Sequence, residues 1–185
     1  ILFIIAKKFK VEEDPRIDVI AELLPGANCG GCGYPGCRGL AEALVKAADS
    51  GSIEGLNCPP AGSEQMGKIG KALGMEVVAG EPTVAVLLCG GTHEKASKKT
   101  DYDGPSKCSI AHTVSCGDKG CPYGCLGLGD CVDACAFGAM YMDELTGLPV
   151  IIEEKCVSCG ACVKACPRKL IEIRQERLKA LGLRD

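Results

Sequence analysis

Fifteen cysteines occur in this chain of 185 residues, and most of them stand in tight groups. The most regular group is a C-x2-C-x2-C-x3-C-P run near the C-terminus, formed by Cys156, Cys159, Cys162, Cys166 and Pro167. In bacterial proteins that carry two [4Fe–4S] clusters, three cysteines of such a run hold one cluster and the fourth holds the other. A four-cysteine zinc site normally has two C-x2-C pairs separated by a longer loop. The run therefore predicts iron–sulfur ligation.

An internal repeat predicts a second half that matches this run. Residues 131–142 align with residues 162–173, and each copy reads as a helical turn between two cysteines followed by a short strand. We expect each half to give its last cysteine to the cluster of the other half. One cluster is then assigned to Cys121, Cys125, Cys131 and Cys166. The other cluster is assigned to Cys135, Cys156, Cys159 and Cys162. The first motif departs from the regular spacing, and the alternatives to Cys121 are Cys116, Cys108 and Cys89.

A second group of four cysteines lies in the N-terminal half, at Cys29, Cys32, Cys37 and Cys58. Four glycines between residues 30 and 36 leave this loop almost free of side chains, which suits donation of backbone N–H groups to cluster sulfurs. The group predicts a further [4Fe–4S] cluster, and structural zinc is the alternative. A G-x-G-x-x-G pattern in the loop follows no predicted strand, so a dinucleotide site is rejected.

Three cysteines lie outside these sets: Cys89, Cys108 and Cys116. We interpret them as buried free thiols, which behave as small apolar residues, and a fourth cluster is the open alternative. His93 and His112 are interpreted as solvated loop residues. An odd number of cysteines without a signal peptide disfavours a disulfide framework.

Capping residues and glycines indicate which elements position these cysteines. Asp14 and Pro15 open a predicted helix, and glycines at 51 and 74 follow two further helices. The three predicted helices cover residues 15–24, 38–50 and 63–73. Strands are predicted over residues 83–88 and 148–152, a surface loop over 93–107, and a polar helix from Arg174 onward.

These elements predict an α+β chain, with a small helical [4Fe–4S] domain before a two-cluster ferredoxin-like domain. The predicted segments are the end of a membrane anchor over 1–10, the helical four-cysteine domain over 11–80, a linker with a strand over 81–120, the ferredoxin-like domain over 121–175 and a helical tail over 176–185. Only seven Phe and Tyr and no Trp are available, so apolar burial needs help in folding these segments, and metal coordination is one source of it.

The first ten residues indicate contact with a membrane. Six apolar residues precede Lys7, Lys8 and Lys10, and this pattern is typical of the last turns of a transmembrane helix with lysines on its cytoplasmic side. The chain does not begin with Met, and the alternative is a short amphipathic start. The net charge of −3, with acids and bases interspersed, gives no basic surface for nucleic acid.

These motifs, in this order, resemble the B subunits of the Rnf complex, a membrane-bound ferredoxin:NAD⁺ oxidoreductase that pumps Na⁺ or H⁺. The matching stretches are E-D-P-R-I at 13–17, N-C-G-G-C-G-Y-P-G-C at 28–37, N-C-P-P at 57–60, Y-G-C-L-G-L-G-D-C at 123–131 and the final cysteine run. Many members of that family continue into further ferredoxin-like repeats, so we expect the chain that ends at Asp185 to be part of a longer polypeptide.

The resemblance implies a protein on the cytoplasmic face of the inner membrane, anchored by one N-terminal helix. It would accept electrons from reduced ferredoxin and relay them through three [4Fe–4S] clusters to membrane subunits. The sequence contains no nucleophile–base pair or flavin motif, so no catalytic side chains are predicted. The alternatives are a soluble polyferredoxin-type shuttle and a structural zinc protein.

Overall fold

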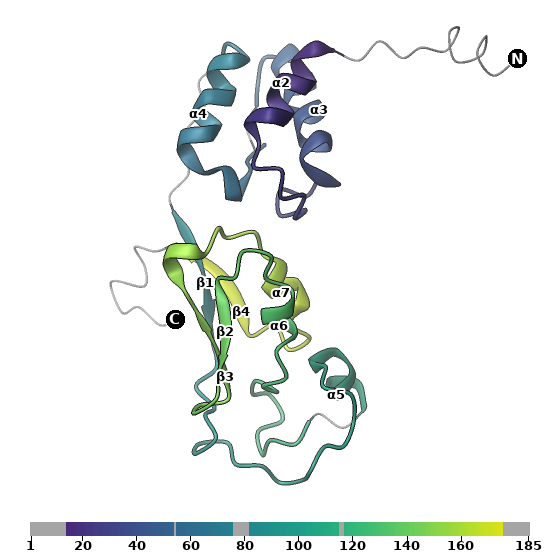
Figure 1. Ribbon diagram of the computed structural model, residues 1–185, viewed down its shortest axis with the longest axis vertical. Helices are drawn as coiled ribbons and strands as arrows, with labels where there is room; N and C mark the ends of the chain where they lie inside the picture. The colour runs from purple at the N-terminus through teal and green to yellow at the C-terminus, as the bar shows by residue number, and fades with distance from the viewer. Residues whose placement is uncertain (1–13, 54, 76–81, 115–116, 176–185) are drawn as a thin grey trace, which may run out of the picture. The chain divides into compact units, whose positions relative to one another are not determined.

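The computed structural model describes residues 14–53, 55–75, 82–114 and 117–175 (Figure 1). The chain forms two compact units, the first ending with residue 79 and the second beginning with residue 80. The predicted domain boundaries remain predictions, and those at residues 1–10 and 176–185 lie outside the described residues. In the described ranges, none of the helices is both long and apolar enough for a membrane span.

The first unit is helical, as its caps and glycines predict. It contains α2 (Pro15–Leu23), α3 (Gly36–Asp49), the 3-10 turn η1 (Pro59–Ala61) and α4 (Gly62–Ala72). The Asp14 carboxylate accepts the backbone N–H of Arg16 at 2.9 Å and so caps α2. Helix α3 begins two residues earlier than predicted, which places Cys37 in its first turn.

A continuous apolar core holds the three helices of the first unit together. Its largest fully buried side chains are Ile20 from α2, Leu40 and Leu44 from α3, and Met66 and Ile69 from α4. The spacing of three or four residues within α3 and within α4 puts each pair on one face of its helix. Burial of each such side chain contributes about 1.5–3 kcal/mol, so this unit has a core that does not depend on its cysteines alone.

The second unit is built on two antiparallel strand pairs. Strand β1 (Thr83–Leu87) pairs with β4 (Ile171–Gln175), and Thr83 lies opposite Gln175. Strand β2 (Met140–Asp143) pairs with β3 (Leu148–Ile151). Two short helices, α6 (Asp130–Asp133) and α7 (Ala161–Ala165), pack against each other on one side of these strands (Figure 1).

The structure confirms the repeat and corrects one secondary-structure prediction. In each copy a helix and then a strand follow in order, α6 with β2 and α7 with β4. The helix predicted from Arg174 is wrong at its start, because Arg174 and Gln175 continue β4 opposite Val84 and Thr83. The strand expected within a linker therefore forms part of the second unit, held by a partner almost ninety residues away.

One helix of the second unit was not predicted at all. Helix α5 (Cys108–Val114) is seven residues long and carries Thr113 and Val114, both β-branched. Short segments of this kind have little intrinsic preference for a helix. Its first N–H groups are satisfied by Asp130, a residue 21 or more positions further along the chain.

Candidate metal centres

The four cysteines of the first unit lie close enough together for their charges to interact. Cys58 is buried, and this burial raises the pKa of its thiol. The neighbouring Cys32, Cys37 and Cys29 raise that pKa further, whereas the N–H of Ala61 lowers it. The predicted set is therefore brought together, although Cys58 lies twenty-one positions beyond Cys37 and is carried by a separate turn.

Asn28 closes the loop that carries three of these cysteines. Its Oδ1 accepts the backbone N–H of Cys37 at 2.8 Å, and its Nδ2 donates to the carbonyl of Gly26 at 3.1 Å. Asn28 itself has a φ of 48°, and Gly36 has a φ of 88°. A Cβ on Gly36 would lie 2.8 Å from Asn28 Oδ1, so this glycine is required for the hydrogen bond.

In the second unit, one cavity is lined by Cys135, Cys156, Cys159 and Cys162, which is the whole of one predicted set. Cys135 comes from the first copy of the repeat, and the other three come from the second copy. Burial raises the pKa of the Cys162 thiol to about 11, and the neighbouring Cys156 and Cys159 add to this. The N–H of Ala139 points to Cys135 Sγ at 3.3 Å, and that of Ala85 to Cys156 Sγ at 3.5 Å.

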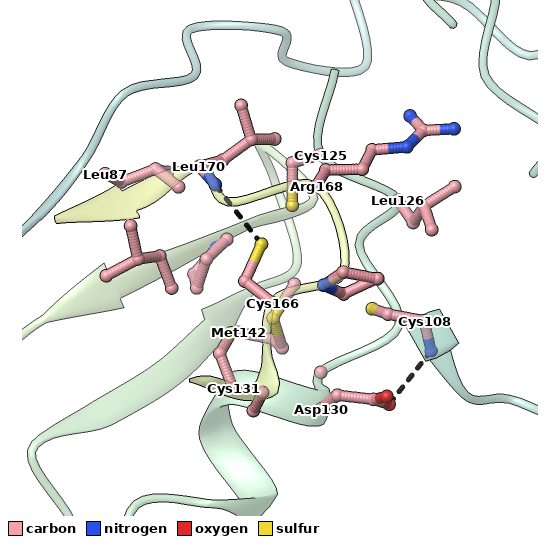
Figure 2. A pocket seen from close by; sticks show the side chains of 15 residues that line it. Leu87, Cys108, Cys125, Leu126, Asp130, Cys131, Met142, Cys166, Arg168 and Leu170 are labelled. Atoms are coloured by element: carbon pink, nitrogen blue, oxygen red, sulfur yellow. Dashed lines mark hydrogen bonds between the residues drawn. The ribbon is translucent and has the colours of Figure 1, made fainter. Parts of the chain in front are cut away.

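A second cavity of this unit contains three members of the other predicted set, Cys125, Cys131 and Cys166 (Figure 2). Burial raises the pKa of Cys131 to about 12, with contributions from Cys125, Cys108 and Cys166. Leu170 donates its N–H to Cys166 Sγ at 3.4 Å, in the same way as Ala139 does to Cys135. Cys121 does not line this cavity, whereas Cys108 does.

The spacing of the cysteines contains a signal for this difference. Cys125, Cys131 and Cys135 follow a C-x5-C-x3-C pattern, which is also the spacing of Cys156, Cys162 and Cys166. Aligning the repeat from its last cysteine backward therefore matches Cys125, and not Cys121, with Cys156. Cys108 could not be found in this way, because it lies outside the repeat.

The other residues considered from sequence fall outside these cavities. Cys89 lies beside Cys125, whose backbone N–H donates to Cys89 Sγ at 3.2 Å. Cys116 lies outside the described residues. His93 and His112 line neither cavity, and His112 belongs to α5 and not to a loop.

A buried cation accompanies the cavity of Cys125. Lys119 is only 8% exposed, and its Nζ donates to the carbonyl of Gly147 at 3.2 Å. Burial raises the pKa of the Cys125 thiol, and the N–H of Gly127 and the charge of Lys119 offset this rise only in part. Lys119 therefore favours negative charge at this cavity, which suits thiolates and an anionic cluster.

Four thiols line each of the two cavities of the second unit. Four thiolates are the usual ligand set of a [4Fe–4S] cluster, and the same set is also found at structural zinc sites. The carboxylate of Asp130, which lines one cavity, accepts two backbone N–H groups.

Comparison with known families identifies iron–sulfur domains in both units. The family model FeS, for an Fe-S cluster, matches residues 24–60, which include the first cysteine group. The family model Fer4_7, a 4Fe-4S dicluster domain, matches residues 121–170. The chain therefore contains an Fe-S domain and a 4Fe-4S dicluster domain, and it combines helices with strands.

Several curated proteins are similar to this chain over most of its length. The B subunit of the Na(+)-translocating ferredoxin:NAD(+) oxidoreductase complex of Acetobacterium woodii is 43% identical over 95% of this chain and 51% of its own length. The B subunit of the ion-translocating oxidoreductase complex of Methanosarcina acetivorans is 44% identical over 85% of this chain and 58% of its own. The proton-translocating counterpart of Clostridium ljungdahlii is 39% identical over 82% and 52%. The chain thus spans a little over half the length of these relatives.

Proposed function

This chain belongs to the B subunits of ion-translocating oxidoreductase (Rnf) complexes, and we propose that it carries electrons within such a complex. In this proposal it accepts electrons from reduced ferredoxin and passes them to membrane subunits of the complex. The names of two of these relatives include ferredoxin and NAD⁺, and the dicluster domain is typical of one-electron carriers.

The cavity formed by Cys135 together with Cys156, Cys159 and Cys162 carries this proposal. Its thiols come from both halves of the repeat, and this crossing is characteristic of two-cluster ferredoxin domains. A bound [4Fe–4S] cluster supplies one-electron redox chemistry at a potential set by its ligands, hydrogen bonds and solvent exposure. The residues around it hold the thiolates, donate N–H groups to sulfur and exclude water.

We propose three such clusters. The first would be held by Cys29, Cys32, Cys37 and Cys58, whose thiols interact electrostatically. The second would use Cys125, Cys131 and Cys166 with a fourth thiolate, and the third the four cysteines of the cavity just described. We also place the protein at the cytoplasmic face of the membrane, in keeping with the lysines at positions 7, 8 and 10.

Metal and sulfide analysis of anaerobically purified protein tests the cluster assignment. About twelve iron atoms and about twelve sulfides per chain are expected, with electron paramagnetic resonance (EPR) signals after reduction with dithionite. Cys32→Ala should remove about four irons and leave the signals of the second unit unchanged. Colourless protein without inorganic sulfide, or protein loaded with zinc, would contradict the proposal.

The assembly is tested separately with the full-length protein in its native membrane. Affinity purification in mild detergent is expected to recover the membrane subunits of the complex, and stopped-flow mixing with reduced ferredoxin should bleach the cluster absorbance. Recovery of this protein alone from the soluble fraction would instead support a soluble polyferredoxin-type shuttle.

A further inference from the structure

We propose that Cys108, from helix α5, provides the fourth thiolate of the cluster held by Cys125, Cys131 and Cys166, in place of Cys121. This inference rests on the proposed function, since it concerns a ligand of one of the proposed clusters. Three independent features of the second unit support it: the register of the repeat, the lining of the cavity and the anchoring of α5.

The register of the repeat leaves one ligand position without a cysteine. Positive φ angles recur at a separation of 31 residues: 77° at Gly127 and 54° at Ser158, then 85° at Gly129 and 74° at Gly160. The backbone of 125–135 therefore repeats in 156–166. Cys125 then corresponds to Cys156, and Leu128 corresponds to the ligand Cys159. Cys121 precedes the repeated segment altogether.

The thiol of Cys108 lies where this missing ligand is needed. Cys108 lines the same cavity as the other three cysteines, and Figure 2 shows its sulfur on the cavity side of α5. It is buried, and it belongs to a small apolar cluster against which Leu128, the residue that replaces a ligand in the repeat, packs.

Helix α5 is attached to the helix that carries Cys131. The carboxylate of Asp130 accepts the N–H groups of Cys108 at 2.9 Å and Ser109 at 3.0 Å. Lys107 and Asp133 form an ion pair at 2.5 Å. These contacts come from Asp130 and Asp133, on the two sides of Cys131 in sequence, and they connect the start of α5 to α6.

The other cysteines near this cavity are used differently. Cys89 Sγ accepts the N–H groups of Cys125 at 3.2 Å and Gly91 at 3.4 Å, and Cys89 is absent from the cavity lining. The backbone carbonyl of Cys121 accepts a hydrogen bond from the guanidinium of Arg168 at 3.5 Å. The side chain of Cys121 does not line the cavity. Neither therefore replaces Cys108 in the geometry that the structure shows.

Three single substitutions in the whole chain test this assignment: Cys108→Ala, Cys121→Ala and Cys89→Ala. Iron and sulfide content, with EPR of the reduced protein, is measured for each under anaerobic conditions. Cys108→Ala should lose about four of about twelve irons, or convert one cluster to a three-iron form, while the first and third clusters keep their signals. The two matched variants should keep all of their iron.

Cys108→Ser separates ligation from folding, because the hydroxyl preserves size and can bind iron weakly. Retention of four-iron content with a displaced potential of one cluster would support a ligand at this position. Full iron and unchanged spectra in Cys108→Ala, or loss of one cluster in Cys121→Ala, would overturn the assignment. Absence of iron from the unsubstituted protein would instead overturn the proposed function itself.

Discussion

The carboxylate of Asp130 accepts the backbone N–H of Cys108 at 2.9 Å and thereby joins two segments 22 positions apart (Figure 2). Burial raises the pKa of Asp130, but its hydrogen bonds with Ser109 and Cys108 outweigh this, and the net pKa is lowered. The carboxylate is therefore ionised near neutral pH. It satisfies two N–H groups at the start of α5 that would otherwise lack acceptors.

Asp130→Ala is expected to loosen α5 and expose the neighbouring cluster. Loss of a cap of this kind costs about 1–2 kcal/mol, so iron release from the second unit to a chelator should accelerate about fivefold to thirtyfold. Asp133→Ala is the matched control, because it removes a half-exposed ion pair with Lys107 that is worth about 0–1 kcal/mol. Equal release rates in the two variants would contradict the role of the cap.

Gly36→Ala is expected to weaken the first cluster more than Gly33→Ala does. Gly36 has a φ of 88° and Gly33 a φ of 86°. An alanine at either position is therefore expected to cost the same backbone strain, about 1–2 kcal/mol. Only the Cβ at position 36 would press on Asn28 Oδ1, whereas nothing lies within 4 Å at position 33. Iron content and chelator resistance of the first cluster measure the difference, and equal losses would show that Asn28 is unimportant for the loop.

Lys119→Met is expected to make the second cluster harder to reduce. A buried positive charge at this position stabilises the reduced cluster by about 1 kcal/mol. Its removal should therefore make the reduction potential of the second cluster more negative by roughly 40 mV, since one electron is transferred. Lys99→Met is the control, since this exposed lysine is screened by solvent and salt. Potentiometric titration followed by EPR measures both variants. A second-cluster potential that is unchanged, or that moves equally in both, would argue against this function of Lys119.

Removal of the clusters is expected to unfold the second unit before the first. Among the described residues, the first unit has a core of eleven buried side chains, only one of which is a proposed ligand. The main core of the second unit has five, and two of these are Cys131 and Cys162. Hydrogen exchange of the apoprotein should show protection retained at Leu44 and Val45 and reduced more than about tenfold in β1 and β4.

Loss of protection in both units at the same step would contradict this prediction. It would mean that the helices of the first unit depend on their cluster as strongly as the strands do. The iron-loaded protein serves as the reference, because its amides report the exchange of the folded state of each unit under the same conditions.

The chemistry of this protein and the local elements that carry it could be read from the order of its residues. The spacing of Cys156, Cys159, Cys162 and Cys166 is a local property, and three of these thiols line one cavity as that spacing predicts. The helix ends were equally readable, because the Asp14 cap and the glycines at 51 and 74 act within a few residues. Interactions between residues that are close in sequence can be read from short sequence patterns.

The distant segments that complete the second unit were revealed by the folded chain alone. The pairing of β1 with β4 extends the strand through Arg174, where the polar pattern had predicted a helix. Likewise, Cys108 reaches the cavity because Asp130 anchors a helix with weak intrinsic preference. Hydrogen bonds and packing between residues 20 to 90 positions apart create no periodicity in the chain, so they become visible only when the backbone is folded.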